Sequence, residues 1–261
     1  MSGQRTNGGP QLLPSYHLVH DGAGYIYSST EQQLESHLEL LIRLADGVCG
    51  NASEARVTFD DGHASQFRYA FPLLQKHGVR AIFFAIAGWM GQRPDYMTWP
   101  QLRELASAGH EIQSHGLTHR FLTQCTDSEL REEVQVARTE LQQRLGAGVD
   151  AISIPFGRWN QRVLRACAAA GYTRIYTSDP KLPFRFSPEV EVRGRFMVKR
   201  STTASDLERI LTAGRGSLWF MNARHQGKLL LRAAIGDRTY HRLWGIWGSR
   251  KALEEDARKE F

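Results

Sequence analysis

Two carboxylates and two imidazoles stand out in the chain because their types and spacing suit metal-assisted hydrolysis. Asp60 and Asp61 are adjacent in the stretch RVTFDDGHASQF, between a short apolar run and later polar residues. His115 and His119 are four residues apart in SHGLTH, so on a helical turn both imidazoles can face one ion. A divalent cation also explains the acid pair, since one aspartate can bind the ion while the other accepts a proton from water.

Alternating apolar and amphipathic runs predict the elements that position these residues. Strands are predicted at residues 15–20, 56–60, 80–88, 110–115, 151–155, 173–179 and 189–200. Helices are predicted at residues 29–47, 65–78, 98–109, 126–146, 160–171 and 205–214. This alternation indicates a parallel sheet with helices outside it, and about seven such units predict a barrel-like α/β fold.

Polar or conformationally special residues follow several of the predicted strands. Asp60 and Asp61 end one strand, His115 ends another, and the segments 155–157 and 178–179 follow two more. In parallel α/β barrels the functional residues gather at the carboxyl ends of the strands. The sequence therefore predicts that these residues share one rim of the barrel.

The three segments resemble the motifs of the polysaccharide deacetylase family, carbohydrate esterase family four. The family motif TFDDG stands intact at residues 58–62, the histidine motif occupies residues 115–119, and the proline-aromatic-glycine motif occupies residues 153–157. The resemblance covers roughly residues 15–200. It implies a distorted (β/α)7 barrel, similar to an incomplete TIM barrel.

The resemblance also implies a role for each matching residue. Asp60 would be the general base, and the backbone N–H of Phe156 would stabilise the oxyanion. A divalent metal, with Zn²⁺ the expected ion, would be held by Asp61, His115 and His119. We expect the residues around the third motif and the following strand to contact the substrate: Pro155, Gly157, Trp159 and Asp179.

Three departures from the family pattern affect groups that support the reaction. Gly116 stands where a serine or threonine usually follows the first histidine. Ser153 stands where an arginine commonly braces the catalytic aspartate, and Arg158 or Arg195 are candidates to replace it. The late histidine motif that supplies the general acid is not visible in the stretch VRGRFMVKRST.

The proton donor is consequently open at the level of sequence. Asp60 could return the proton that it accepts, or a histidine near the predicted rim could serve, with His20 and His63 as the two candidates. The remaining histidines are assigned structural or surface positions: His17, His37, His77, His110, His225 and His241.

Composition and charge suggest three parts of the chain: a flexible N-terminus (1–14), the barrel (15–215) and a basic, tryptophan-containing helical extension (216–261). The net charge is +6, and residues 181–261 hold 17 of the 33 lysines and arginines but only 9 of the 27 acids. The extension predicts either helices packed on the barrel or a peripheral contact with an anionic membrane. No motif accompanies this charge that would indicate nucleic-acid binding.

Targeting and redox signals favour a cytoplasmic protein, with membrane association at the inner face through the extension. The N-terminus shows no apolar signal-peptide region, and no stretch has the length of a membrane span. The three cysteines, Cys49, Cys125 and Cys167, are too far apart for a metal knuckle and odd in number.

The sequence favours a metal-dependent hydrolase that removes N-acetyl groups from an amino-sugar poly- or oligosaccharide, or from a lipid-linked sugar, in bacterial cell-surface or exopolysaccharide metabolism. One alternative keeps the metal but acts on another C–N bond, as an amidase or imidase. The other is a non-catalytic sugar-binding barrel, which the missing arginine and histidine favour and the intact Asp60, Asp61, His115 and His119 oppose.

Overall fold

The computed structural model describes residues 12–20, 25–49, 57–180 and 183–213, together with Ala223 and Gly227. By its contacts the chain divides into two compact units, Met1–Gly214 and Arg215–Phe261. Apart from Ala223 and Gly227, the described residues belong to the first unit. The helical extension predicted at 216–261, and the membrane contact predicted for it, therefore lie outside the described residues. Leu13 and Pro14, assigned by sequence to a flexible N-terminus, already belong to a strand.

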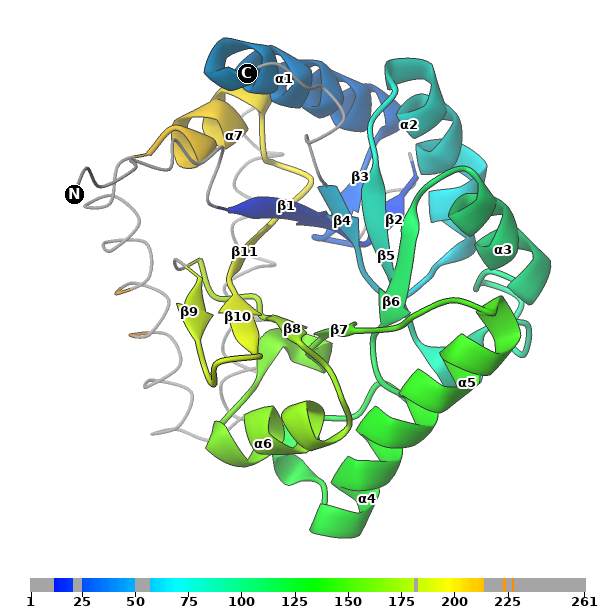
Figure 1. The fold of residues 1–261 in the computed structure, drawn as a ribbon. Coiled ribbons are helices and arrows are strands. Elements are labelled where there is room, and N and C mark those ends of the chain that lie inside the picture. The colour runs from blue at the N-terminus through cyan, green and yellow to red at the C-terminus, as the bar shows by residue number, and fades with distance from the viewer. Residues whose placement is uncertain are drawn as a thin grey trace, which may run out of the picture. The chain divides into compact units, whose positions relative to one another are not determined.

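A curled sheet of nine strands forms the centre of this unit (Figure 1). Its order is β11-β1-β4-β5-β6-β7-β8-β10-β9, and each neighbouring pair is parallel except β10 with β9. The strands are β1 (Leu13–Tyr16), β4 (Val57–Phe59), β5 (Ala81–Ala85), β6 (Glu111–Ser114), β7 (Ala151–Ser153), β8 (Arg174–Tyr176), β9 (Phe184–Arg185), β10 (Glu191–Arg193) and β11 (Arg195–Met197).

One chain segment joins the two sides of this sheet. Strands β10 and β11 are separated only by Gly194, yet β10 pairs with β8 and β11 pairs with β1. Residues 191–197 therefore form the seventh strand position of a distorted barrel, after β1, β4, β5, β6, β7 and β8. This arrangement confirms the predicted α/β barrel class.

The strand expected at 189–200 is thus divided at Gly194 into β10 and β11, and two further predicted strands also break. The strand expected at 15–20 breaks at His17 into β1 and a short β2 (Leu18–Val19), which pairs with β3 (Ser28–Ser29) in a separate two-stranded sheet. The strand expected at 80–88 ends at Ala85 and continues into a 3₁₀ turn, η3 (Ala87–Trp89). Both breaks occur where the chain leaves the barrel wall and builds the rim.

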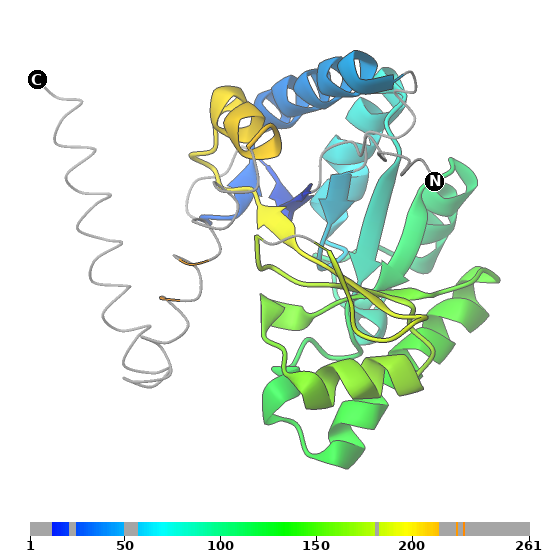
Figure 2. The same ribbon diagram turned by 60° about the vertical axis from the view of Figure 1, so that its left-hand side comes forward.

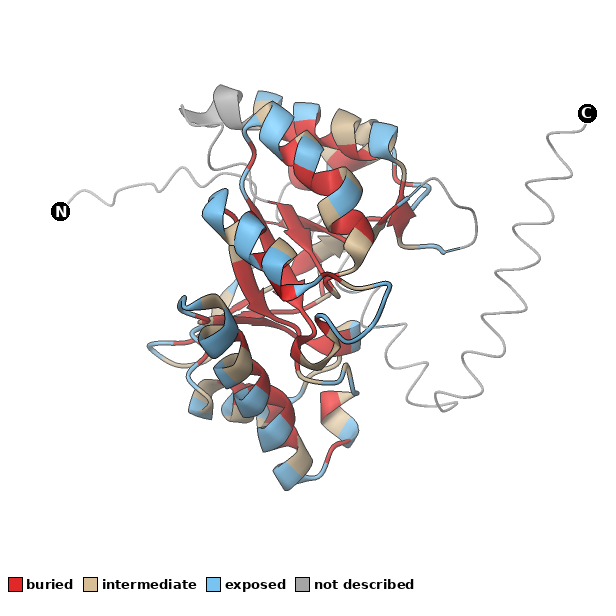
Figure 3. Cartoon of the chain, turned by 90° about the vertical axis from the view of Figure 1, so that its right-hand side faces the viewer, coloured by how far each residue is buried: buried red, intermediate tan, exposed pale blue. Residues whose placement is uncertain are grey.

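Helices cover the outside of the sheet, with their exposed faces toward solvent and their buried faces toward the strands (Figures 2 and 3). They are α1 (Glu31–Cys49), α2 (Phe71–His77), α3 (Trp99–Ser107), α4 (Asp127–Arg131), α5 (Ala137–Leu145), α6 (Gln161–Ala169) and α7 (Ala204–Leu211), with short 3₁₀ turns η4 (Leu122–Gln124) and η6 (Pro155–Gly157). Each of the six predicted helices is present. None of the described helices is long and apolar enough to cross a bilayer.

Two of the predicted helices contain a turn of π-helix. The helix expected at 65–78 begins with η2 (Gln66–Ala70) and continues as α2, with Pro72 near the start of α2. The helix expected at 126–146 is interrupted by η5 (Glu132–Val136), between α4 and α5. A π turn inserts a residue and shifts which side chains face inward, and such turns are frequent at functional sites.

Apolar side chains fill the barrel and the layer beneath the helices. The rings of Phe59 and Phe83 stack with centroids 4.9 Å apart, and those of Phe84 and Tyr176 lie 5.0 Å apart. All four side chains are fully buried. This packed interior leaves the carboxyl ends of the strands to carry the polar groups.

Candidate metal and active site

The structure brings the two predicted motifs together at one rim of the barrel. Asp60 and Asp61 follow β4, and His115 follows β6. The side-chain atoms of Asp61, His115 and His119 that can bind a metal lie within 4.8 Å of one another. The predicted ligand set therefore forms one cluster.

The geometry of this cluster fits a cation. The Asp61 Oδ1 atom lies 3.3 Å from His115 Nε2 and 3.4 Å from His119 Nε2. This oxygen is buried and has no hydrogen-bond partner among the described residues. A buried, unpartnered carboxylate oxygen facing two imidazole nitrogens is the donor set of a two-histidine, one-carboxylate metal site.

The tautomer of His115 is set by its other ring nitrogen. His115 Nδ1 lies 2.8 Å from the backbone carbonyl oxygen of Ser153, to which only a protonated Nδ1 can donate. The lone pair of Nε2 is then directed at Asp61 and is free to bind an ion, as in metal sites where a second partner orients the ligand. Burial lowers the pKa of His119 to about 4, with a further contribution from His115, so His119 is neutral at pH 7.

Three site residues adopt backbone conformations that are uncommon for residues other than glycine. Asp61, His119 and Phe156 have φ angles of 75°, 59° and 59°, and they are the non-glycine residues with positive φ in the described part of the chain. Such conformations cost free energy and persist where surrounding contacts impose them, often at functional sites. The fold thus stores backbone strain at two metal-ligand positions and at the third motif.

Asp60 is held by an arginine from the far end of the barrel sequence. Arg195 Nη1 and Nη2 donate to Asp60 Oδ1 and Oδ2, each at 2.7 Å, in a bidentate pair. The Ser153 hydroxyl donates to Asp60 Oδ2 at 3.1 Å and accepts from Arg195 Nη2 at 2.7 Å. Arg195 is fully buried, and its Nη1 also donates to Thr58 Oγ1. Arg195 therefore occupies the role that the sequence left open between Arg158 and Arg195.

The charges around the acid pair hold both aspartates in their ionised form. Burial raises the pKa of Asp60, but the Arg195 guanidinium and the His115 ring lower it well below its usual range. Burial likewise raises the pKa of Asp61, and the neighbouring imidazoles, His115 first, lower it overall. For His115 itself burial lowers the pKa, while the two carboxylates raise it by more.

The third motif supplies an exposed aromatic ring beside the cluster. Phe156 is 50% exposed, and its ring lies 4.4 Å from that of His119 and 3.9 Å from that of Phe121. A Cβ atom at Gly157 would lie 2.5 Å from Ser178 Oγ, so this position has no room for a side chain. The turn at Pro155 through Gly157 therefore packs closely on the end of β8 and presents Phe156 outward.

Two of the predicted substrate-contact residues are paired with each other. The Trp159 Nε1–H donates to Asp179 Oδ2 at 2.8 Å, and Asp179 is buried. Asp179 thus orients the Trp159 indole, which also packs near Phe184. Substrate contact by these two residues stays a prediction.

One histidine at the rim, His17, was assigned by the sequence to a structural or surface position and is half-buried in the structure. His17 follows β1, directly after the Tyr16 carbonyl that accepts from the Asp60 N–H at 2.9 Å. Its Nδ1 is buried without a hydrogen-bond partner among the described residues. Burial lowers the pKa of His17, against the charges of Asp61 and Asp60. No sequence signal marked this position, because the predicted strand continued from 15 to 20 and placed His17 within it.

The two predicted donor histidines lie farther out. His20 is exposed and stacks on Tyr69 with centroids 6.5 Å apart. His63 is half-buried, and its Nδ1 accepts the Ser65 N–H at 3.1 Å and contacts the Ser65 hydroxyl at 2.8 Å. A role in proton transfer stays a prediction for both.

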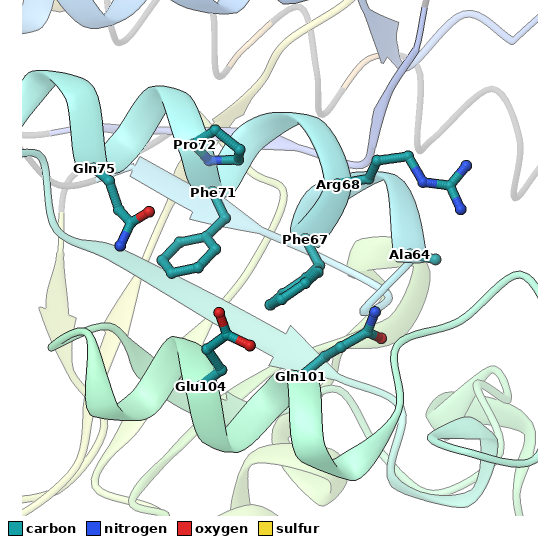
Figure 4. Close-up of a pocket in the computed structure, with 8 residues that line it drawn as sticks. All are labelled: Ala64, Phe67, Arg68, Phe71, Pro72, Gln75, Gln101 and Glu104. Carbon is teal, nitrogen blue, oxygen red and sulfur yellow. The ribbon is translucent and has the colours of Figure 1, made fainter.

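A groove away from this rim lies between η2 and α2 on one side and α3 on the other (Figure 4). Its walls carry Phe67 and Phe71, whose rings stack at 5.4 Å, and Glu104 lies on the opposite side. None of the predicted site residues lines it. The candidate site is therefore the rim cluster.

Comparisons with known proteins show which family the sequence resembles. The sequence profile described as Polysaccharide deacetylase matches residues 48–175, which contain the acid pair and both histidines. A chitooligosaccharide deacetylase of Bradyrhizobium sp. is 30% identical over 143 residues, covering 54% of this chain and 63% of that protein. The matched regions span 44% to 63% of the length of the first relatives compared.

Solved structures share the fold. The structure of IcaB from Ammonifex degensii superposes with a TM-score of 0.68 at 21% identity, covering 79% of this chain and 98% of that one. The Streptococcus pyogenes deacetylase PplD, in complex with acetate, gives 0.66 at 18% identity over 77% and 97%. Together with the motifs, the profile match assigns residues 48–175 of this chain to the polysaccharide deacetylase family.

Proposed function

We propose that this protein is a metal-dependent hydrolase that removes N-acetyl groups from an amino-sugar poly- or oligosaccharide. The single observation that carries the proposal is the convergence of Asp61, His115 and His119 beside an Asp60 carboxylate that is clamped in its ionised form. Chitooligosaccharide deacetylases among the relatives support the substrate class. Zn²⁺ is the ion that this donor set favours.

The residues of the site divide the work of amide hydrolysis. Asp61, His115 and His119 would hold the ion, which supplies a Lewis acid that acidifies water and polarises a carbonyl. Asp60, ionised and held by Arg195, accepts the proton of the attacking water. The Phe156 N–H stabilises the developing oxyanion, and the exposed Phe156 ring offers an apolar face to the sugar.

His17 is the residue we assign as proton donor to the leaving amine. The pairing of Asp60 with Arg195 favours its carboxylate form, so we expect Asp60 to release the proton that it accepts to solvent rather than hold it for the amine. His17 ends the strand beside that of Asp60, and its buried Nδ1 has no partner among the described residues. We place it ahead of His20 and His63.

The clamp on Asp60 also supports turnover over the non-catalytic alternative. The arginine that the third motif lacks is supplied by β11, so the chain retains a held general base despite Ser153. The exopolysaccharide role, the cytoplasmic location and the membrane contact of residues 216–261 stay predictions from the sequence.

The test is to measure the metal content of the purified protein and the acetate released from N-acetylglucosamine oligomers. We expect one divalent ion per chain and acetate release that a chelator abolishes and Zn²⁺ restores. His17→Ala should retain the ion and lose activity by about 10²-fold or more, whereas His20→Ala should not. Stoichiometric metal without acetate release would favour the amidase or the sugar-binding alternative, and absence of metal binding would refute the proposal.

A further inference from the structure

The loop between the two histidine ligands has an unusual backbone and lacks the hydroxyl that the family motif usually provides. It begins at Gly116, with a φ of 79°, and ends at His119, with a φ of 59°. On one side its carbonyl groups are tied to the end of the β5 segment: Ala87 N–H donates to the Gly116 oxygen and Gly88 N–H to the Leu117 oxygen. The N–H groups of the loop need a separate acceptor.

That acceptor is the carboxylate of Glu133, from the π turn η5. Its Oε2 accepts the backbone N–H of Leu117 at 3.1 Å and of Thr118 at 3.0 Å, and its Oε1 accepts the Thr118 hydroxyl. The side chain is 3% exposed. The buried Glu133 carboxylate thus accepts three hydrogen bonds from two adjacent residues, Leu117 and Thr118. Such charge-assisted hydrogen bonds are about twice as strong as neutral ones.

The surrounding sequence accommodates this carboxylate. In η5 the neighbouring Glu132 is exposed while Glu133 is buried, which places one of two adjacent acids against the loop. A Cβ atom at Gly116 would lie 3.3 Å from Glu133 Oε2, closer than is comfortable. Glycine at this position therefore leaves room for the carboxylate, in a backbone conformation that glycine adopts at little cost.

We propose that Glu133 is a positioning residue of the metal site, which holds the loop 116–118 so that His115 and His119 face Asp61. The inference rests on the proposed metal-dependent function. Without the Glu133 carboxylate, the part-buried N–H groups of Leu117 and Thr118 lose their acceptor, and the strained conformation of His119 loses its support. The two imidazoles are then no longer held in the binding geometry before the ion arrives. Ordering them on binding costs free energy, so the affinity for the ion falls.

The test is metal affinity, measured on the full chain by competition for Zn²⁺ with a chromophoric chelator. Glu133→Ala should weaken Zn²⁺ binding by about 10- to 100-fold, the usual scale for groups that orient metal ligands. Glu133→Gln should retain most of the affinity, because its amide oxygen can still accept both N–H groups. Glu132→Ala, the exposed neighbour on the same turn, is the matched control and should bind Zn²⁺ like the wild type.

A second measurement separates positioning from general stability. The Co²⁺-loaded Glu133→Ala protein should show an altered visible absorption spectrum, which a mere loss of stability in a folded chain would not produce. Wild-type Zn²⁺ affinity in a folded Glu133→Ala protein would overturn the inference. If that variant does not fold, Thr118→Val decides, since it removes one bond to the carboxylate, and unchanged affinity there overturns the inference too. A wild-type chain that binds no metal would instead refute the proposed function.

Discussion

Replacing Arg195 with methionine should expose how far the general base depends on a residue outside the motifs. The substitution keeps an apolar side chain of similar length in the barrel and removes the guanidinium. Asp60, which is 2% exposed, then keeps the Ser153 hydroxyl as its described side-chain hydrogen bond and loses its two 2.7 Å bonds to Arg195. A buried carboxylate is thereby left without its counter-charge.

The expected cost follows from the burial of both partners. Removing one member of a fully buried ion pair typically destabilises a protein by about 3–5 kcal/mol, mostly because the other charge is left uncompensated. For a domain of this size, about 1 kcal/mol shifts Tm by about 2–4 °C, so Arg195→Met should lower Tm by about 6–20 °C. A typical domain has a total free energy of unfolding of about 5–15 kcal/mol, so a wild-type stability above about 7 kcal/mol leaves the variant largely folded at 25 °C after this loss.

A double-mutant cycle with Asp60→Asn tests the reasoning by urea unfolding. Each single variant leaves one buried charge unpaired, whereas Arg195→Met combined with Asp60→Asn leaves none. The double variant should therefore be more stable than the sum of the two single losses predicts, by about 1–3 kcal/mol. Arg195→Lys keeps the charge without the two-pronged geometry and should recover part of the stability but little of the activity.

The result that would refute this account is specific. If Arg195→Met unfolds within about 1 kcal/mol of the wild type and releases acetate at the wild-type rate, the guanidinium neither compensates nor positions Asp60. Additive losses in the cycle would show that the two residues act independently despite their contact.

Three further predictions concern the ligands, the base and the pH dependence of stability. The double variant His115→Ala/His119→Ala should lose the metal. One equivalent of metal in the purified double variant would refute the ligand assignment. Asp60→Asn should keep the metal and lose turnover by about 10²-fold or more; near-normal acetate release would place the base elsewhere. Burial lowers the pKa of His110 from 6.5 to about 4 in the folded state. As pH drops from 6.5 toward 4, the unfolded state therefore binds a proton that the folded state does not, and the free energy of unfolding should fall. Between pH 7 and pH 5 the free energy of unfolding, measured with urea, should fall by about 2 kcal/mol at most. The control is His110→Asn, whose side chain does not titrate but can still accept the Ala81 N–H. A similar loss of stability in this variant would contradict the assignment to His110.

Much of the fold could be predicted from the sequence because its signals are local. The alternation of short apolar runs with amphipathic stretches placed each strand of the barrel, and cap residues such as Thr98 and Gly78 mark helix ends that the structure confirms. The break at His17 was missed, because the run from 15 to 20 has no glycine or proline to interrupt it.

The candidate metal ligands were also within reach of the sequence. Asp61, His115 and His119 lie in two short motifs, and the rule that parallel strands end at one rim brings those motifs together. The left-handed backbone at Asp61 and His119 was not visible, because nothing in either residue type demands it.

The tertiary structure decided which residues support the site, since the sequence left Arg158 and Arg195 as alternatives and did not indicate Glu133. Arg195 reaches Asp60 across 135 residues of chain, and Glu133 reaches Leu117 from a π turn whose extra residue no periodicity revealed. Spacing in a sequence determines which side chains share a face of one element, but not which elements meet when residues 191–197 join the two sides of the barrel. Closure pairs β11 with β1, which itself pairs with β4, so a buried guanidinium meets the buried carboxylate whose charge must be balanced.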